Sequence, residues 1–226
     1  MNLIAELQYF PTINLYKILY KFSHITFEQC EHYQKMSFRN RCQIAGAEGI
    51  INLSVPLEKG RDQKTPMKDV KIADAQPWQA QHWKTIVSCY SRSPWFEFYR
   101  DELEGLYTTR FDLLVDWNRA CFEWSLKVLR LPITVALTED YQKVYVPEKG
   151  VDWRGKFLPK NRATIAGLPA STAPGQLPAT GQPSVDGQPP LRYRQVFEER
   201  TGFIPGLSIL DLLFCEGKEA IRHIRS

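Results

Sequence analysis

The first thirty residues alternate between two hydrophobic patterns, and this alternation restricts the fold more than any other feature. Residues 2–7 form a short apolar run typical of a strand, and residues 25–27 are β-branched and aromatic. Between them, residues 13–22 carry apolar side chains at helical spacing, and Pro11 suits the first turn of that helix. A strand, a helix and a strand in this order predict a βαβ unit with two parallel strands. We therefore expect an α/β protein.

The rest of the chain predicts a small mixed sheet and a helical middle section. A hairpin is expected from residues 41–44 and 50–55, joined by a glycine-containing turn. Short strands are expected at residues 70–72 and 133–137. Amphipathic periodicity predicts helices, which we place at residues 79–90, 95–107 and 111–130.

Residues 163–190 differ in composition from the flanking segments. They contain six prolines and four glycines, no aromatic residue, and Asp186 as the only charge. Such a segment buries too little apolar area to offset its ordering entropy, so we predict a disordered insert. Residues 1–162 are then the main α/β body, and residues 191–226 complete the same domain by packing back on it. Ser208 is a suitable N-cap there, and Asp211 suits the first turn of the helix that follows.

Composition narrows the class of protein. The net charge of +4 is far below that of a dedicated nucleic-acid binder, so no nucleic-acid partner is expected. The five cysteines include no C-x-x-C pair, which argues against a disulfide framework and a metal site, and reduced thiols favour the cytoplasm. No signal peptide and no apolar run near the ~20 residues of a membrane span are visible. No sequence motif implies a cofactor.

The densest polar cluster lies at residues 28–41, directly after the second predicted strand. Ligands bind outside the carboxyl ends of strands in open α/β sheets. Basic side chains there can pair with phosphate or carboxylate, and aromatic or amide side chains can orient a substrate. A solvated charged segment is the structural alternative. The candidate substrate-binding residues are Tyr33, Lys35, Arg39, Asn40 and Arg41.

Acid–base chemistry has fewer candidates. Glu31 and His32 are the candidate catalytic residues, and Glu28 can form an acid–base pair with Glu31. His82, at the start of a predicted helix, is a further candidate for contacting the substrate. For both histidines a purely structural role is the alternative.

These residues carry a resemblance to the WbqC-like family of bacterial proteins. The resemblance covers most of the chain outside the insert, and residues 39–41 and 208–217 are its most specific parts. Aligned on Pro11, Glu6 stands where the commoner family opening has glutamine, and Asn14 where it has glycine. The remaining matching segments are residues 9–11, 31–35, 55–56, 78–90 and 91–96.

The resemblance implies a function connected with surface polysaccharides such as O-antigen. It implies a cytoplasmic transferase that moves an acyl or aminoacyl group to an activated sugar, with an anionic, sugar-nucleotide type of substrate. A non-catalytic binding or scaffold protein of a polysaccharide assembly pathway is the alternative. The oligomeric state is left open.

Overall fold

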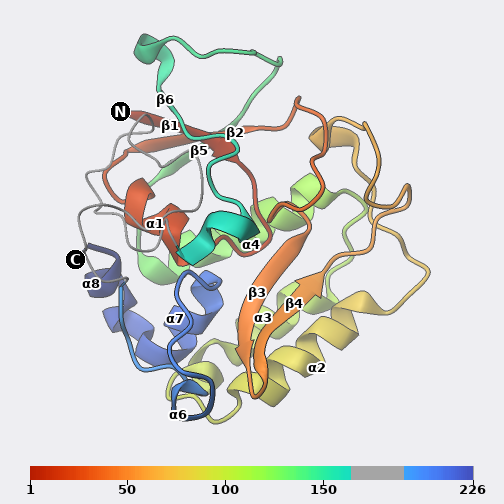
Figure 1. Ribbon diagram of the computed structural model, residues 1–226. Coiled ribbons are helices and arrows are strands. Elements are labelled where there is room, and N and C mark those ends of the chain that lie inside the picture. The colour runs from red at the N-terminus through yellow and green to blue at the C-terminus, as the bar shows by residue number, and fades with distance from the viewer. Residues whose placement is uncertain (164–190, 226) are drawn as a thin grey trace.

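The computed structural model describes residues 1–163 and 191–225 (Figure 1). The predicted disordered insert therefore lies, except for residue 163, outside the described residues. A four-stranded parallel sheet occupies the top of the view, and a two-stranded hairpin lies below it. The helices gather around the hairpin and beneath the sheet.

The predicted βαβ unit is confirmed. Strand β1 (Asn2–Glu6) is followed by helix α1 (Ile13–Leu19) and strand β2 (His24–Glu28), and the two strands pair in parallel from Asn2–His24 to Glu6–Glu28. Four of the five residues of β1 are buried, as expected for a parallel strand covered on both faces.

Two later strands complete the sheet in the order β5-β2-β1-β6. Strand β5 (Thr134–Leu137) was predicted and pairs in parallel with β2. Strand β6 (Val151–Asp152) pairs in parallel with the other edge of β1. The sequence did not indicate β6, because two residues are too few to show an alternating pattern.

The predicted hairpin is also confirmed. Strands β3 (Arg41–Gly46) and β4 (Gly49–Ser54) pair antiparallel around a two-residue turn. Gly49 has a φ of +114°, which a residue with a side chain rarely adopts. The short strand expected at residues 70–72 is absent, because Lys71 and Ile72 form only isolated bridges there.

Three predicted helices form the middle of the chain. They are α2 (Trp78–Tyr90), α3 (Phe96–Thr108) and α4 (Leu114–Leu129), each within three residues of its expected bounds. Helix α4 packs Phe122 against Phe27 of β2 and Tyr16 of α1, with ring centroids 4.8 and 5.9 Å away. One hydrophobic core thus joins the sheet to the helices. Short 3₁₀ turns are η1 (Met67–Asp69), η2 (Pro147–Lys149), η3 (Pro159–Asn161) and η5 (Gly217–Glu219).

The C-terminal segment packs on the body as three helices, α6 (Glu198–Thr201), α7 (Ile209–Glu216) and α8 (Ala220–Arg225). The N-cap prediction is confirmed, since Ser208 Oγ accepts the Leu210 backbone N–H at 3.3 Å. Backbone bonds from Ser208 to Gln43 in β3 and from Ile13 in α1 to Leu207 attach this segment to the body. Helix α7 therefore lies against elements formed by the first fifty residues.

Candidate functional site

The order of the parallel strands marks one place where a site can form. From β1 the chain proceeds to β2 and β5 on one side, and it returns much later to β6 on the other side. In open α/β sheets the crevice at such a reversal, beyond the carboxyl ends of the strands, is where ligands bind. Acidic side chains end three of these strands, namely Glu6 of β1, Glu28 of β2 and Asp152 of β6.

Glu6 is fully buried at the end of β1. Its Oε2 accepts the Gly155 backbone N–H at 2.8 Å, and its Oε1 accepts the Gln8 side-chain amide at 3.3 Å. Burial raises the pKa of this carboxyl above its ordinary value, against the opposing effects of Arg39 and the Gly155 N–H, while the charge of Glu31 raises it further. Glu6 is thus a buried acid whose proton is held more tightly than that of a solvated carboxyl group.

Glu28 and Arg154 form a second charged group beside it. Glu28 Oε1 accepts from Thr138 Oγ1 and the Cys30 N–H at 2.8 Å, and its Oε2 accepts from Tyr145 at 3.0 Å and Arg154 Nη1 at 3.3 Å. The Arg154 guanidinium also lies 4.6 Å from the centre of the Tyr145 ring. These contacts join the ends of β2 and β5 to the segment just after β6.

Asp152 completes this group. Arg154 donates to it from Nη2 at 2.7 Å and from Nε at 3.0 Å. Burial acts to raise the pKa of Asp152, but the hydrogen bonds and charge of Arg154 outweigh it, and the net pKa lies below the ordinary value. Asp152 is therefore a fixed negative charge that orients Arg154.

The third group is the buried ion pair of Arg39 with Glu31. Arg39 is fully buried and donates to Glu31 through Nη2. Its backbone is held in place because its carbonyl accepts from Asn118 of α4 at 2.6 Å, and the neighbouring Phe38 carbonyl accepts the Tyr9 N–H at 3.0 Å. The loop that carries Arg39 is thus fixed to the segment that follows β1.

Part of the Arg39 guanidinium makes no hydrogen bond to the residues that the structure describes. Within the described residues, its Nε and Nη1 have no hydrogen-bond partner, and the Nε of Arg41 lacks one as well. Gln8 Oε1, a buried acceptor two residues beyond Glu6, also has no hydrogen-bond partner among these residues. Unpaired buried donors on a cation are costly, and an anionic oxygen would satisfy them.

The structure places the other predicted site residues, both substrate-binding and catalytic, differently. Tyr33 donates to Asn40 Oδ1 at 2.9 Å, and Asn40 Nδ2 donates to the Val55 carbonyl at 3.0 Å, so this pair braces the loop. Lys35 is exposed and pairs with Asp62 at 2.5 Å. His32 is exposed, and its backbone bridges Pro66.

His82 lies in a buried aromatic cluster rather than beside Arg39. Its Nδ1 is 3.0 Å from the Tyr9 hydroxyl, which is 2.6 Å from the hydroxyl of Tyr107. Its ring packs edge-on to Trp78 with centroids 5.2 Å apart. Burial lowers the pKa of His82 to about 4, so the ring is neutral near pH 7.

Sequence reasoning had not singled out Glu6, Asp152 or Arg154 as site residues. The available signal for Glu6 was an acidic residue at the end of an apolar strand. The signal for the other two was the Asp-Trp-Arg run at residues 152–154, in which opposite charges flank a tryptophan. Neither signal indicated that residues 6 and 152 end neighbouring strands, because this depends on the order of the sheet.

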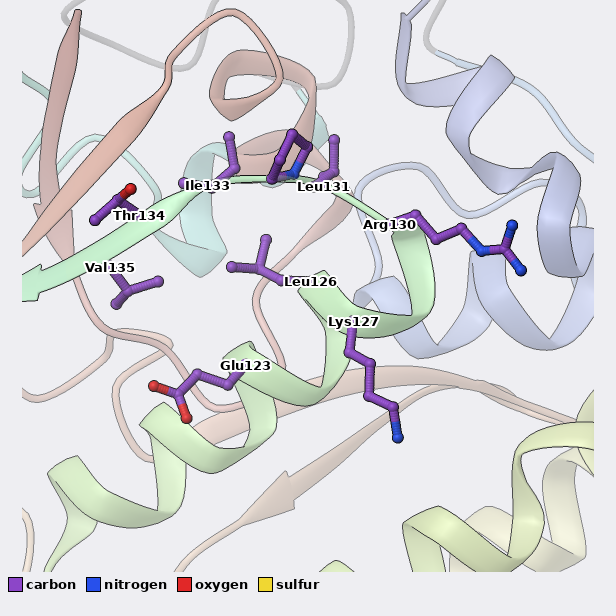
Figure 2. Close-up of a pocket in the computed structure, with 9 residues that line it drawn as sticks. Glu123, Leu126, Lys127, Arg130, Leu131, Ile133, Thr134 and Val135 are labelled. Carbon is purple, nitrogen blue, oxygen red and sulfur yellow. The ribbon is translucent and has the colours of Figure 1, made fainter.

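The clearest hollows in the described surface lie elsewhere. One, drawn in Figure 2, is at the amino end of β5, opposite the carboxyl edge. Leu126 and Val135 point into it, whereas Glu123, Lys127 and Arg130 point outward. Lys127 and Glu123 are engaged in surface ion pairs with Glu102 and Arg119.

The described residues include neither a cluster of metal-ligand side chains nor a helix suited to a membrane. In the part of the chain that the structure describes, no group of three His, Cys, Asp or Glu side chains is arranged to hold a metal ion. Within the same residues, no helix combines the length and apolar character needed to cross a membrane.

Comparison with known proteins identifies the family of this chain. The model of the WbqC-like protein family matches residues 8–153, a stretch that includes the hairpin, the three long helices and the 28–41 segment. The chain is also similar to "Uncharacterized protein Rv1507c" of Mycobacterium tuberculosis, with 26% identity over 206 residues, covering 85% of this chain and 84% of that protein. No solved structure matches.

Proposed function

Because the chain belongs to the WbqC-like protein family, we propose that it is a cytoplasmic transferase of bacterial surface-polysaccharide biosynthesis, of the O-antigen type. Its substrate is a sugar nucleotide or a similar phosphorylated compound, and the transferred group is an acyl or aminoacyl group. The observation that supports this proposal best is the buried Arg39 guanidinium at the carboxyl edge of the sheet, of which two nitrogens, Nε and Nη1, have no hydrogen-bond partner among the described residues.

The role of Arg39 in this proposal is to bind the anionic part of the substrate. A phosphate oxygen accepts well from a guanidinium fork, and a low-polarity setting strengthens such a bond. Arg41 supplies a further donor through Nε. Tyr33 and Asn40 keep the loop in shape, and Lys35 lies at its exposed end.

Proton transfer in this proposal falls to the buried acids. Glu31 is held against Arg39, and Glu6 lies close enough to both for their charges to affect its pKa. A carboxyl with a raised pKa can both accept and return a proton near neutral pH. Glu6 is therefore a stronger candidate for general acid–base catalysis than the exposed His32, in a role particular to this chain, since the commoner family opening has glutamine at that position. Glu31 is the second candidate because it is buried against Arg39.

A non-catalytic binding or scaffold protein is the second candidate function. It is favoured by the enclosure of Arg39 and by four surface hollows that are lined by residues outside the 28–41 segment. On this alternative, the buried charges hold the carboxyl edge together and the surface carries the function. Binding of small phosphorylated ligands supports the transferase, whereas the absence of such binding supports the scaffold.

Thermal-shift measurements with a panel of sugar nucleotides test the proposal. A ligand present at a hundred times its Kd adds about 2.7 kcal/mol to stability, which raises the Tm of a chain of this size by about 5–10 °C. Arg39→Lys should weaken binding by about tenfold or more, since lysine has no bidentate fork. Arg119→Gln, at an exposed surface pair, is the matched control and should bind as the wild type does.

The acid–base role has its own test. Glu6→Gln keeps the shape of the side chain and should leave ligand binding intact while turnover falls by about 10²–10⁴-fold. Unchanged turnover would remove Glu6 from the mechanism. If no member of the panel raises the Tm of the wild type, the scaffold function replaces the transferase.

A further inference from the structure

A groove lies between α3, the end of α4 and helix α8, and none of its lining residues belongs to the 28–41 segment. Its floor is aromatic and aliphatic. Phe98 stands at its edge with 74% of its surface exposed, the largest exposure of any aromatic residue described. Its ring packs edge-on to Trp95 and Tyr99, with centroids 6.0 and 5.0 Å away. The groove is lined by Trp95, Phe98, Tyr99, Glu102, Lys127, Val128, Leu129, Arg130, Lys218, Ile221 and Arg225.

The rim of this groove is positively charged. Lys127 is neutralised by Glu102, whose two oxygens lie 3.1 Å from its Nζ. For Arg130, Lys218 and Arg225, no carboxylate of residues 1–163 or 191–225 lies within ion-pair distance. An apolar floor with three cations on its rim that no described carboxylate pairs fits an occupant that is apolar in the middle and acidic at its sides.

Helix α3 has that composition on its own outer side. Asp101 is three residues after Phe98, so the two side chains share one exposed face of the helix. Glu97 is also exposed and precedes Phe98 directly, and it pairs with Arg100 of the same helix at 3.3 Å. Asp101 is the acid of this face that no cation of the described residues pairs. The same exposed phenylalanine therefore borders both a basic groove and an acidic helix face.

We propose that two copies of this chain form a two-fold dimer in which α3 of each copy lies in the α3–α4–α8 groove of the other. Phe98 of one copy covers the apolar floor of its partner. Asp101 and Glu97 face the partner's basic rim, where Lys218 and Arg225 are the nearest candidates. Because the axis is two-fold, every contact occurs twice.

A second copy is the occupant favoured here because both halves of the interface are present on one chain. A two-fold interface needs a surface that is complementary to itself, and an acidic helix beside a basic groove has this property. Burying Phe98 also removes an aromatic side chain from water. The proposal does not depend on the transferase function.

Sedimentation velocity over a range of protein concentrations tests this proposal. The wild type should sediment as a dimer, and Phe98→Ser should raise the dimer dissociation constant by about tenfold or more. Val144→Ser is the matched control, because Val144 is 73% exposed but lies outside the groove. All the exchanged side chains are exposed, so the Tm of each monomer should stay near that of the wild type.

Charge exchange gives the sharper test. Variant one carries Glu97→Lys and Asp101→Lys, and variant two carries Lys218→Glu and Arg225→Glu. Each alone should be monomeric, because like charges then meet at both halves of the interface. Mixed in equal amounts they should form a heterodimer, in which opposite charges meet in both halves.

Three results would overturn the proposal. They are a monomeric wild type at every concentration, a dimer that Phe98→Ser leaves intact, and a mixture of the charge variants that does not associate. A monomer that binds an acidic peptide or an anionic polysaccharide through this groove would assign the groove to that ligand instead.

Discussion

Met36 lies in the segment that carries the candidate site, and its backbone has an unfavourable conformation. Its φ is +58° and 63% of its surface is exposed. A residue with a Cβ atom is strained at such an angle, whereas glycine is not. The loop that leads to Arg39 thus contains strain that is not balanced by burial of the Met36 side chain.

Met36→Gly should therefore raise the free energy of unfolding by about 0.5–1 kcal/mol. Met36→Ala removes the same side chain but keeps the Cβ atom, so it should give no gain. Urea unfolding at a fixed pH measures both. Equal effects of the two substitutions would show that the backbone angle is not the cause.

His82 predicts a pH dependence of stability. Its folded pKa of about 4 lies below the ordinary histidine pKa of 6.5, so between pH 6.5 and pH 4 the unfolded chain binds a proton that the folded chain does not bind. Its contribution to stability is complete above pH 6.5 and is lost as the pH falls toward 4, with a total on the order of 3 kcal/mol. Glu6 and Asp211, whose folded pKa values are raised, act in the opposite direction as the pH falls.

Comparing the wild type with His82→Gln isolates this effect from those two carboxyl groups. The difference in unfolding free energy between the two proteins should shrink between pH 6.5 and pH 4. A constant difference across this range would mean that His82 is protonated equally in the folded and unfolded states. Urea unfolding at five or six pH values is sufficient.

The residues of the candidate site show what the sequence could predict. Glu31 and Arg39 are eight positions apart, and a polar block after a strand was enough to single them out. Glu6 and Arg154 could not be found in this way, since nothing local indicates that residues so far apart in the chain share one edge of a sheet. The burial of Arg39 could not be predicted either, because basic side chains are usually exposed.

At the scale of elements, Asp211 joins three segments. It lies in the first turn of α7, as expected, but it is fully buried. Tyr90 of α2 and Tyr193 donate to it at 2.6 Å each, and Gln195 donates at 2.9 Å. Burial raises the pKa of its carboxyl group, opposed by these three bonds. The residue connects α2 and α7 to the segment that begins at residue 191.

Asp211→Ala should lower the free energy of unfolding by on the order of 3–5 kcal/mol, because it leaves three buried donors without an acceptor. Ser208→Ala removes the N-cap of the same helix and the hydrogen bond from Ser208 Oγ to the Phe10 carbonyl, and it should cost about 1–2 kcal/mol. Chemical denaturation of both variants measures the two losses of unfolding free energy. A loss no greater than that of Ser208→Ala would show that the donors find other acceptors or water.

The elements themselves were predicted unevenly. The long helices α2 and α4 were found because many turns repeat the same apolar pattern. Strand β6 and helix α8, with two and six residues, are too short for any period to be visible. Such elements form because the surrounding structure holds them, as β1 holds β6, and that information is not local.

At the scale of the whole molecule, the C-terminal segment supplies part of the core. Leu210, Leu213 and Phe214 of α7 are fully buried, and Phe214 packs against Tyr90 and Phe96 with centroids 4.8 and 5.3 Å apart. The family match at residues 8–153 does not extend to this helix. The matched region and the folded unit therefore differ in extent.

A chain that ends at residue 162 should accordingly lose cooperative unfolding, because removal of α7 exposes the apolar side chains it covers. Near-UV circular dichroism followed during heating checks this. The full-length chain should show a single sharp transition and the shortened chain a broad one. A sharp transition in the shortened chain would show that the C-terminal segment is a separate unit.

The position of β6 at one edge of the sheet has a consequence for synthesis in the cell. β1 acquires β2 as a neighbour as soon as residue 28 has emerged, but its other edge has no partner until residue 152 is made. At ordinary rates of translation that interval lasts on the order of 10 s. Throughout this time the nascent chain carries an open, apolar strand edge, which is the kind of surface that chaperones shield and that aggregates when they do not.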